Sequence, residues 1–197
     1  LQLWSSDSTV QKRIVAAELS GKFGDTEGPI TSVRLINGGG NKLDAFAKLG
    51  VHYQLGECVV SADGLSARAS TLTVTLANTA PDGLPSYISG RSDVGGIRGP
   101  VGSNRDFVAV YAPARATITS TLMNGKEAFV HEAWIRERDM VVFDVQLDPD
   151  ASATMTVTWQ EDATDSDEQP LPLTPRVVLP PLAIPASVQL TDGSACR

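Results

Sequence analysis

Hydrophobic and polar residues alternate one by one along several stretches of the chain. Leu72, Val74 and Leu76 are separated from one another by single threonines, and the same alternation recurs in residues 139–147 and 152–160. Successive side chains of a β-strand point to opposite faces of its sheet, so such a stretch buries one face and exposes the other. The pattern predicts antiparallel sheets that share a hydrophobic core.

From residue 50 onward the sequence indicates a series of short strands separated by turns. Asn124-Gly125 is the sharpest hairpin signal, because both residues tolerate positive φ. No helix-length crossover separates the strands, which favours a sandwich over a parallel sheet. We expect a mainly β protein, with an antiparallel, immunoglobulin-like β-sandwich over residues 50–197. The expected strands are residues 50–60, 69–78, 106–112, 116–123, 127–136, 139–147, 152–160, 172–179 and 184–191.

The first quarter of the chain mixes helix and strand. Residues 5–21 have the capping pattern and the apolar stripe of a helix, and a strand is expected at residues 32–37. Three consecutive glycines end that strand, and a short helix is expected over residues 41–48. We expect residues 1–49 to form a small α/β lead-in, the end of an upstream domain.

The charge balance restricts the partners of the chain. The 197 residues include 16 basic and 23 acidic side chains, which gives a net charge of -7. This excess opposes binding to phosphate backbones and anionic lipid surfaces, so nucleic acid is not an expected partner. No apolar run approaches the roughly 20 residues that a membrane-spanning helix needs. The chain begins at Leu1 without a signal pattern, and we expect it to be cut from a longer precursor.

The two cysteines, Cys58 and Cys196, lie near opposite ends of the strand-rich region. Two thiols cannot form a zinc site alone, and His52 and His131 lack ligand spacing, so no metal site and no cofactor are expected. In an oxidising compartment, a Cys58–Cys196 bridge would stabilise the fold by about 4–5 kcal/mol in the chain-entropy model. Two unrelated buried thiols are the alternative.

Several features that suggest chemistry have a simpler structural explanation. The run Gly38–Lys42 lacks the glycine spacing of a phosphate-binding loop, so we interpret it as a tight turn. The acidic run 161–168 lacks the calcium-loop pattern, so we interpret it as a solvated loop. No nucleophile elbow is present, and no catalytic residue is predicted. Trp4, Trp134 and Trp159 are expected in the core rather than as a sugar-stacking platform.

The long connection 79–104 holds the most suggestive polar residues. Arginines on a glycine-rich loop of an acidic protein can form a local pocket for a carboxylate or a phosphate. The alternative is that they pair with the protein's own carboxylates. The candidate ligand-loop residues are Arg91, Arg98, Asn104 and Arg105.

A series of short motifs is distributed along the chain. The motifs are LQLWSSD at residues 1–7, NGGGNKLD at 37–44, TVTLANTAP at 73–81, GLPSY at 83–87, NR at 104–105, VAVY at 108–111 and the late Cys196. Together they resemble the C-terminal part of a bacterial envelope family named domain of unknown function 4012, in a form typical of actinobacteria. The match covers nearly the whole chain. One departure is Ala45-Phe46, where members of the family more often have consecutive tyrosines.

The resemblance implies an extracellular protein of the cell envelope. It implies a longer chain with an upstream membrane anchor, of which this is the distal region, and a terminal cysteine that pairs with Cys58. It supplies no catalytic residue, because the family has no established activity.

These observations predict a non-catalytic extracellular cell-envelope module with an interaction or scaffold role in surface-polymer or cell-wall biology. Its partner would be a cell-wall or surface polysaccharide or an envelope protein. The alternative is an accessory part of an envelope glycan-assembly enzyme whose active site lies largely upstream, with the arginine loop as a clamp. Arginines that face an open cleft would favour the enzyme, and arginines tied to internal carboxylates would disfavour it. A third reading is a mechanical spacer, which predicts no concave surface with convergent polar groups.

Overall fold

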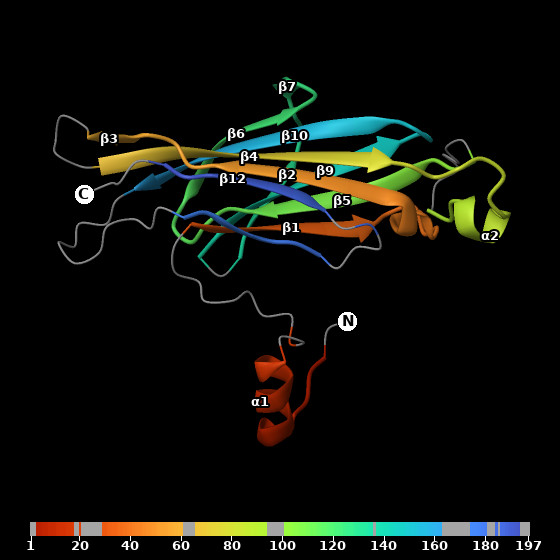
Figure 1. The fold of residues 1–197 in the computed structure, drawn as a ribbon, viewed down its shortest axis with the longest axis horizontal. Coiled ribbons are helices and arrows are strands. Elements are labelled where there is room, and N and C mark those ends of the chain that lie inside the picture. Colours follow the sequence, from red (N-terminus) through yellow and green to blue (C-terminus); the bar gives the residue numbers. More distant parts are fainter. Residues whose placement is uncertain are drawn as a thin grey trace.

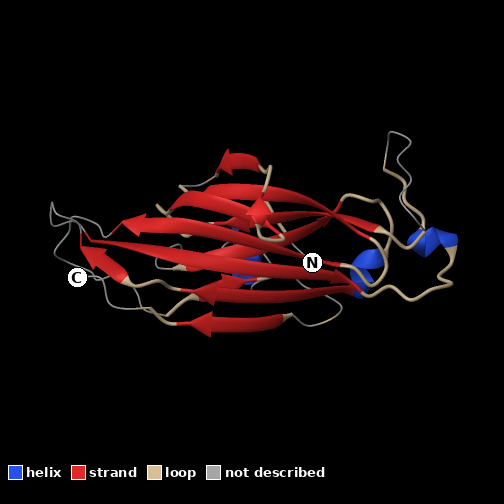
Figure 2. Cartoon of the chain, turned by 90° about the horizontal axis from the view of Figure 1, so that it is seen from above, coloured by secondary structure: helices blue, strands red, loops and turns tan. Residues whose placement is uncertain are grey.

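The computed structural model describes residues 3–17, 20, 29–60, 66–93, 101–135, 137–162, 174–180, 184 and 186–193. Two β-sheets pack face to face, and the short helices lie outside them (Figures 1 and 2). The smaller sheet contains, in spatial order, β11 (Arg176–Val178), β1 (Ile30–Asn37), β5 (Asn104–Tyr111), β9 (Asp139–Leu147) and β8 (His131–Trp134).

The larger sheet is built around two long central strands. Its spatial order is β12 (Ser187–Thr191), β2 (Ala47–Gln54), β4 (Ser66–Asn78), β10 (Ser152–Asp162), β6 (Thr117–Met123) and β7 (Lys126–Glu127), and β3 (Cys58–Val60) also pairs with β4. No helix within the described ranges has the length and apolar character needed to cross a membrane.

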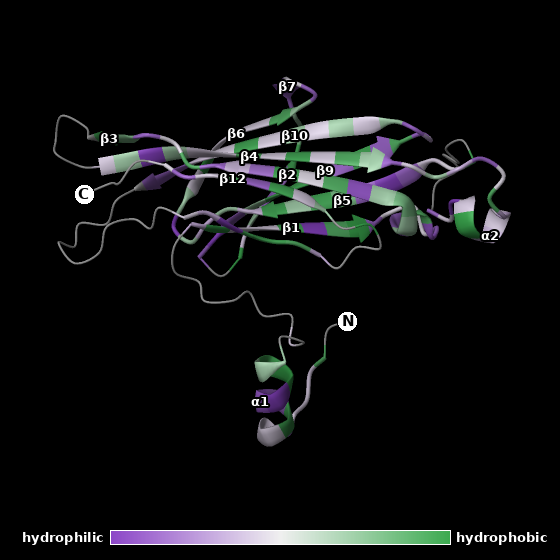
Figure 3. Cartoon of the chain, viewed as in Figure 1, coloured by the Kyte–Doolittle hydropathy of each residue, from purple (hydrophilic) through white to green (hydrophobic). Residues whose placement is uncertain are grey.

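One hydrophobic core fills the space between the sheets. The alternating residues predicted from the sequence supply it, so that Val108 and Phe143 of the smaller sheet are buried together with Val74 and Trp159 of the larger one. The intervening threonines form an ordered ladder on the other face of the larger sheet, because Thr73 lies opposite Thr156 in register. Figure 3 shows the resulting alternation of colour along β4 and β10. The period-two prediction is confirmed for these strands.

The expectation of purely antiparallel sheets is wrong at two edges. β11 pairs with β1 in parallel, and β12 pairs with β2 in parallel, so both sheets are mixed. Both strands come from the end of the chain and reach their partners by longer connections rather than by hairpins, which is how parallel neighbours are joined. The alternation of residues reports which face is buried and carries no information on the direction of the neighbouring strand.

The predicted hairpin is confirmed, whereas the predicted strand that follows it is divided. Asn124 and Gly125 have φ values of 52° and 76° and connect β6 to β7. The expected strand at 127–136 splits into β7 in the larger sheet and β8 in the smaller one. The chain crosses between the layers over residues 128–130, which have no regular structure.

The N-terminal helix α1 (Ser8–Ala16) is shorter than predicted and contacts water on all sides. Asp7 caps it, because its Oδ1 accepts hydrogen bonds from the N–H groups of Thr9 and Val10 at 2.8 and 2.9 Å. None of its residues is buried, and Figure 1 shows it apart from the sheets.

The remainder of the expected α/β lead-in belongs to the sandwich. The expected division after residue 49 falls inside β2, and β1, which lies before it, pairs with β5 along six residues from Ser32 to Asn37. The helix expected over residues 41–48 is a single 3₁₀ turn, η1 (Leu43–Phe46). Both sheets therefore use residues from the first quarter of the chain.

Candidate functional site

The glycine-rich turn and the arginine loop meet at one end of the sandwich. The N–H groups of Gly38 and Gly39 donate to the carbonyl of Arg105 at 2.7 and 3.1 Å, and Ser92 N–H donates to the carbonyl of Gly39 at 2.8 Å. Lys42 N–H donates to the carbonyl of Ile88, which follows the start of the short helix α2 (Ser86–Ser89). Motifs that are far apart in the sequence are thus neighbours in space.

The glycines of this turn are required by packing. Gly40 has a φ of 66°, and a Cβ atom on it would lie 2.0 Å from Ser92 Oγ. A Cβ on Gly38 would lie 2.8 Å from the ring of Phe107. Only glycine tolerates both the conformation and the close approach. These contacts agree with the interpretation of residues 38–42 as a tight turn.

Two of the candidate arginines are bound by carboxylates of the protein itself. Arg105 makes a bidentate pair with Asp144, Nε to Oδ1 at 2.8 Å and Nη2 to Oδ2 at 2.5 Å. Arg91 makes the same kind of pair with Asp93 at 2.9 and 2.5 Å, and Arg105 Nη1 lies 3.5 Å from Asp93 Oδ2. The hydrogen bond from Arg91 lowers the pKa of Asp93 to about 2. The hydrogen bond from Arg105 likewise lowers the pKa of the Asp144 carboxyl below its usual value.

This arrangement is the alternative that the sequence left open for the arginine loop. Asn104, the third candidate, donates from Nδ2 to Asp106 Oδ2 at 2.7 Å. Arg98 lies outside the described residues. The guanidinium groups of Arg91 and Arg105 are therefore occupied by internal partners.

Asp106 is a buried carboxyl beside this network. It is 1% exposed, and among the described residues no group donates a hydrogen bond to its Oδ1. Burial raises its pKa to about 7, with a smaller contribution from the charge of Asp44. Sheet packing covers the Asp106 carboxyl, so it does not line an open cleft. Its titration instead makes the stability of the fold depend on pH.

A second buried charge lies in the core at the other end of β4 and β10. Glu161 pairs with Arg68 and accepts hydrogen bonds from Trp159 Nε1 at 3.0 Å and from the Tyr53 hydroxyl at 3.3 Å. Burial raises the pKa of Tyr53 well above its usual range. The interpretation of residues 161–168 as a solvated loop is wrong for Glu161, which belongs to β10, and residues 163–168 lie outside the described part.

The expectation that all tryptophans are buried is confirmed for Trp159 and wrong for the other two. Trp159 is fully buried, whereas Trp134 is 70% exposed and Trp4 is 79% exposed. Trp134 ends β8, which is the last strand of the smaller sheet, so neither face of this strand is fully covered. Phe129, just before β8, is 91% exposed and meets the His131 ring edge-on at 5.9 Å.

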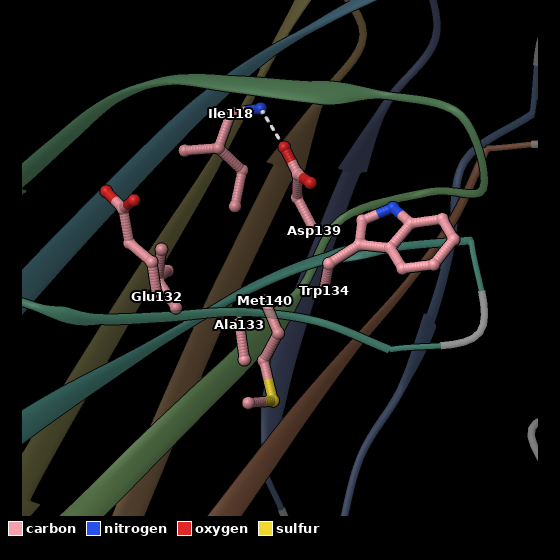
Figure 4. A pocket seen from close by; sticks show the side chains of 7 residues that line it. Ile118, Glu132, Ala133, Trp134, Asp139 and Met140 are labelled. Atoms are coloured by element: carbon pink, nitrogen blue, oxygen red, sulfur yellow. Dashed lines mark hydrogen bonds between the residues drawn. The ribbon is translucent and has the colours of Figure 1, made fainter.

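A cleft of about 300 Å³ opens beside Trp134, between β6, β8 and β9. Figure 4 shows Glu132 and Asp139 on the same side of the ribbon as Ile118, with the indole of Trp134 at the edge. We call it the Trp134 cleft. Its lining residues are Ile118, Glu132, Ala133, Trp134, Asp139, Met140 and Val141.

The base of the Trp134 cleft is held rigidly. Asp139 lies opposite Trp134 in the hairpin, and its Oδ2 accepts a hydrogen bond from Ile118 N–H at 3.0 Å across the two sheets. Arg138, which precedes Asp139, is 2% exposed and donates from Nη1 to the carbonyls of Ile30 at 2.8 Å and Ala112 at 2.9 Å. The hairpin that carries Trp134 is thus tied to β1 and to the end of β5.

Glu132 is the free polar group of the Trp134 cleft. It is exposed, and within the described ranges no hydrogen bond or ion pair engages its carboxylate. The cleft therefore combines an exposed indole face, a free carboxylate and a rigid floor, which are the components of a small binding site.

A second, shallower hollow of about 440 Å³ lies on the threonine face of the larger sheet. Gly50 leaves a gap between Thr75 and Ser187, and Lys48 and His52 border it. The described residues that line it include no tryptophan, tyrosine or phenylalanine, and His52 Nε2 is already 3.0 Å from Thr191 Oγ1. We regard the Trp134 cleft as the stronger candidate.

The structure describes one of the two cysteines. Cys58 begins β3 and lies opposite Arg68 on β4, while Cys196 lies outside the described residues, so their bridge stays a prediction. In the described ranges no three His, Cys, Asp or Glu side chains gather in a way that could hold a metal ion.

Comparison with known proteins gives no family, and the solved structures that are similar to this chain include two distant likenesses. Neither a known protein family nor a curated protein matches the sequence. A candidate nutrient-binding protein of Legionella pneumophila is similar over 68% of this chain and 43% of its own, with 9% identity and a TM-score of 0.41. A mutant two-domain M1 zinc metallopeptidase bound to L-tryptophan is similar over 72% of this chain and 22% of its own, with 10% identity and a TM-score of 0.26. The chain spans less than half of either protein, and similarity at these scores indicates no function.

Proposed function

We propose that this chain is a non-catalytic, immunoglobulin-like module of the extracellular cell envelope that contacts a surface polymer or an envelope protein. It would be the distal part of a protein anchored by an upstream segment. The Trp134 cleft and the exposed Phe129 before it form the contact surface.

The observation that supports this proposal is the exposure of Trp134 at the free edge of the smaller sheet. Large aromatic side chains on soluble proteins are usually covered, and exposed ones beside a concave, partly polar site mark interaction surfaces. Trp134 is 70% exposed while Arg138, four residues later, is 2% exposed and holds the hairpin in place. A rigid support with an uncovered aromatic group favours binding over a purely mechanical role.

The pairing of the arginines weighs against the alternative of an accessory enzyme. Arg91 and Arg105 are engaged by Asp93 and Asp144, so neither guanidinium is available as a clamp without loss of a bidentate pair. A clamp of this kind would need an open, convergent arrangement of donors.

The direct test is binding of the purified chain to an envelope extract that holds both glycans and surface proteins. We expect retention of the native chain on immobilised extract, strong reduction for Trp134→Ala, and no change for Trp4→Ala. Trp4 is the matched control because it is also an exposed tryptophan but lies outside the sheets. Absence of retention for the native chain would contradict the proposed function.

A further inference from the structure

We propose that the Trp134 cleft binds one pyranose ring of a neutral glycan, stacked on the indole of Trp134 and hydrogen-bonded to Glu132. The proposal rests on the function proposed above and names the class of ligand for the same surface.

The indole of Trp134 suits an apolar face of a sugar ring. A pyranose with equatorial hydroxyls has an apolar C–H face, and covering this face and an exposed indole together removes apolar surface from water. Trp134 offers such a face at 70% exposure, and its position is fixed by the hairpin to Asp139 and by the buried Arg138. A preorganised aromatic surface loses little conformational freedom when a ligand binds.

The carboxylate of Glu132 lies where it can accept hydrogen bonds from a stacked sugar. Glu132 and Trp134 are two residues apart on β8 and therefore point to the same face, about 6–7 Å apart at their Cα atoms. Figure 4 shows both on the side of the cleft that faces Ile118. A sugar ring stacked on the indole places its rim hydroxyls toward Glu132, whose carboxylate accepts hydrogen bonds and has no partner in the described part of the chain.

The charge and the size of the Trp134 cleft restrict its ligand. Glu132 and Asp139 make the cleft acidic and the chain carries a net charge of -7, so an anionic glycan is repelled. A volume of about 300 Å³ is at the lower end of the roughly 300–1,000 Å³ of small-molecule sites, which suits a single ring better than a long peptide. The ligand class is therefore a neutral polysaccharide, of which the cleft binds one sugar unit.

The first experiment measures retention on a panel of immobilised glycans. The neutral members are β-glucan, mannan, galactan and chitin oligosaccharide, and polygalacturonate is the anionic comparison. We expect retention on at least one neutral glycan and none on polygalacturonate. We expect about tenfold weaker binding for Trp134→Ala, partial recovery for Trp134→Phe, weaker binding for Glu132→Gln and no change for Trp4→Ala. No retention on any neutral glycan, equal binding by Trp134→Ala, or preference for polygalacturonate would overturn the inference.

A second experiment separates this inference from the proposed function. The envelope extract is divided, and one half is treated with periodate to destroy vicinal diols and the other with protease. Loss of binding after periodate alone supports a glycan ligand. Loss after protease alone overturns the glycan inference and leaves an envelope protein as the partner. No binding to untreated extract removes the proposed function as well. Thermal unfolding of each variant confirms that a loss of binding is not a loss of fold.

Discussion

Two regions of the molecule differ in whether their polar groups already have partners within the protein. One is the end of the sandwich that carries the arginines, and the other is the edge that carries Trp134. At the arginine end, Arg91 and Arg105 are paired, and the glycine turn is packed against Ser92 and Phe107. At the β8 edge, Glu132 and Trp134 have fewer neighbours and remain open. The arginine end has more residue types that could bind a ligand, but they are paired within the protein. The β8 edge has fewer such residues, and they are free to bind. Residue type alone therefore does not locate a binding site, because the partners that the fold supplies decide which groups remain available.

The largest effect on stability is expected where a paired charge is buried in the core. We expect Glu161→Ala to lower the free energy of unfolding by about 3–5 kcal/mol, because it leaves the Arg68 guanidinium buried without its carboxylate. Urea-induced unfolding measures this loss, and Glu132→Ala, at an exposed position, is the control. A loss below 1 kcal/mol would mean that the core does not depend on the pair.

The second test uses the buried carboxyl of Asp106. Its folded-state pKa of about 7 lies above its ordinary value of 3.8. The contribution of protonated Asp106 to the free energy of unfolding is therefore fully present below about pH 4. It is lost as the pH rises through about 7. Because each pKa unit corresponds to about 1.4 kcal/mol, the change amounts to a few kcal/mol.

Asp106→Asn removes this titration and retains the hydrogen bond from Asn104. We expect the variant to be more stable than the native chain at pH 8 and similar to it at pH 4, as measured by chemical unfolding across the pH range. An unchanged pH profile would show that Asp106 is ionised and solvated in the fold.

The third test concerns the exposed pair of the arginine end. We expect Arg105→Ala to lower the free energy of unfolding by no more than about 1 kcal/mol, because pairs in contact with water contribute little and are screened by salt. A double-mutant cycle with Asp144→Ala, at low and high salt, measures the coupling. Binding to the envelope extract should be unaffected, and a clear loss of binding would reverse the comparison between the two regions.

The smallest effect on stability is expected at the free edge. Trp134→Ala should change the free energy of unfolding by about 0.5 kcal/mol or less, because the side chain is largely exposed. The same variant should lose most of its binding. A large loss of stability would indicate that Trp134 belongs to the fold rather than to a ligand site.

Local pattern predicted the strands well, since alternation is a property of the strand itself. The expected strand 139–147 is β9 with the same bounds, and 152–160 differs from β10 only by two residues at its end. Features that depend on the partner were not predicted. The parallel edges of β11 and β12 and the change of layer between β7 and β8 arise from how distant segments meet.

The pairing of the candidate arginines could not be predicted for the same reason. The arginines of the loop stand out in the sequence, but the carboxylate that engages Arg105 lies 39 residues away. Trp134 looks like a core residue because tryptophans usually are. One signal was present in the sequence, since residues 129–135 lack the clean alternation of a half-buried strand. An irregular pattern next to well-formed strands is typical of an edge with no covered face.

The parallel edge strands have a mechanical consequence. β1 begins at Ile30, close to the start of the sandwich, and β11 and β12 are the last strands in the part of the chain that the structure describes. When two parallel strands are pulled from opposite ends, their hydrogen bonds carry the load side by side instead of opening one after another. Tension applied between the segment before β1 and the segment after β12 would thus load the parallel β1–β11 and β2–β12 ladders in shear. The strands β11 and β12 would then resist the separation of β1 and β2 from the ends of the two sheets.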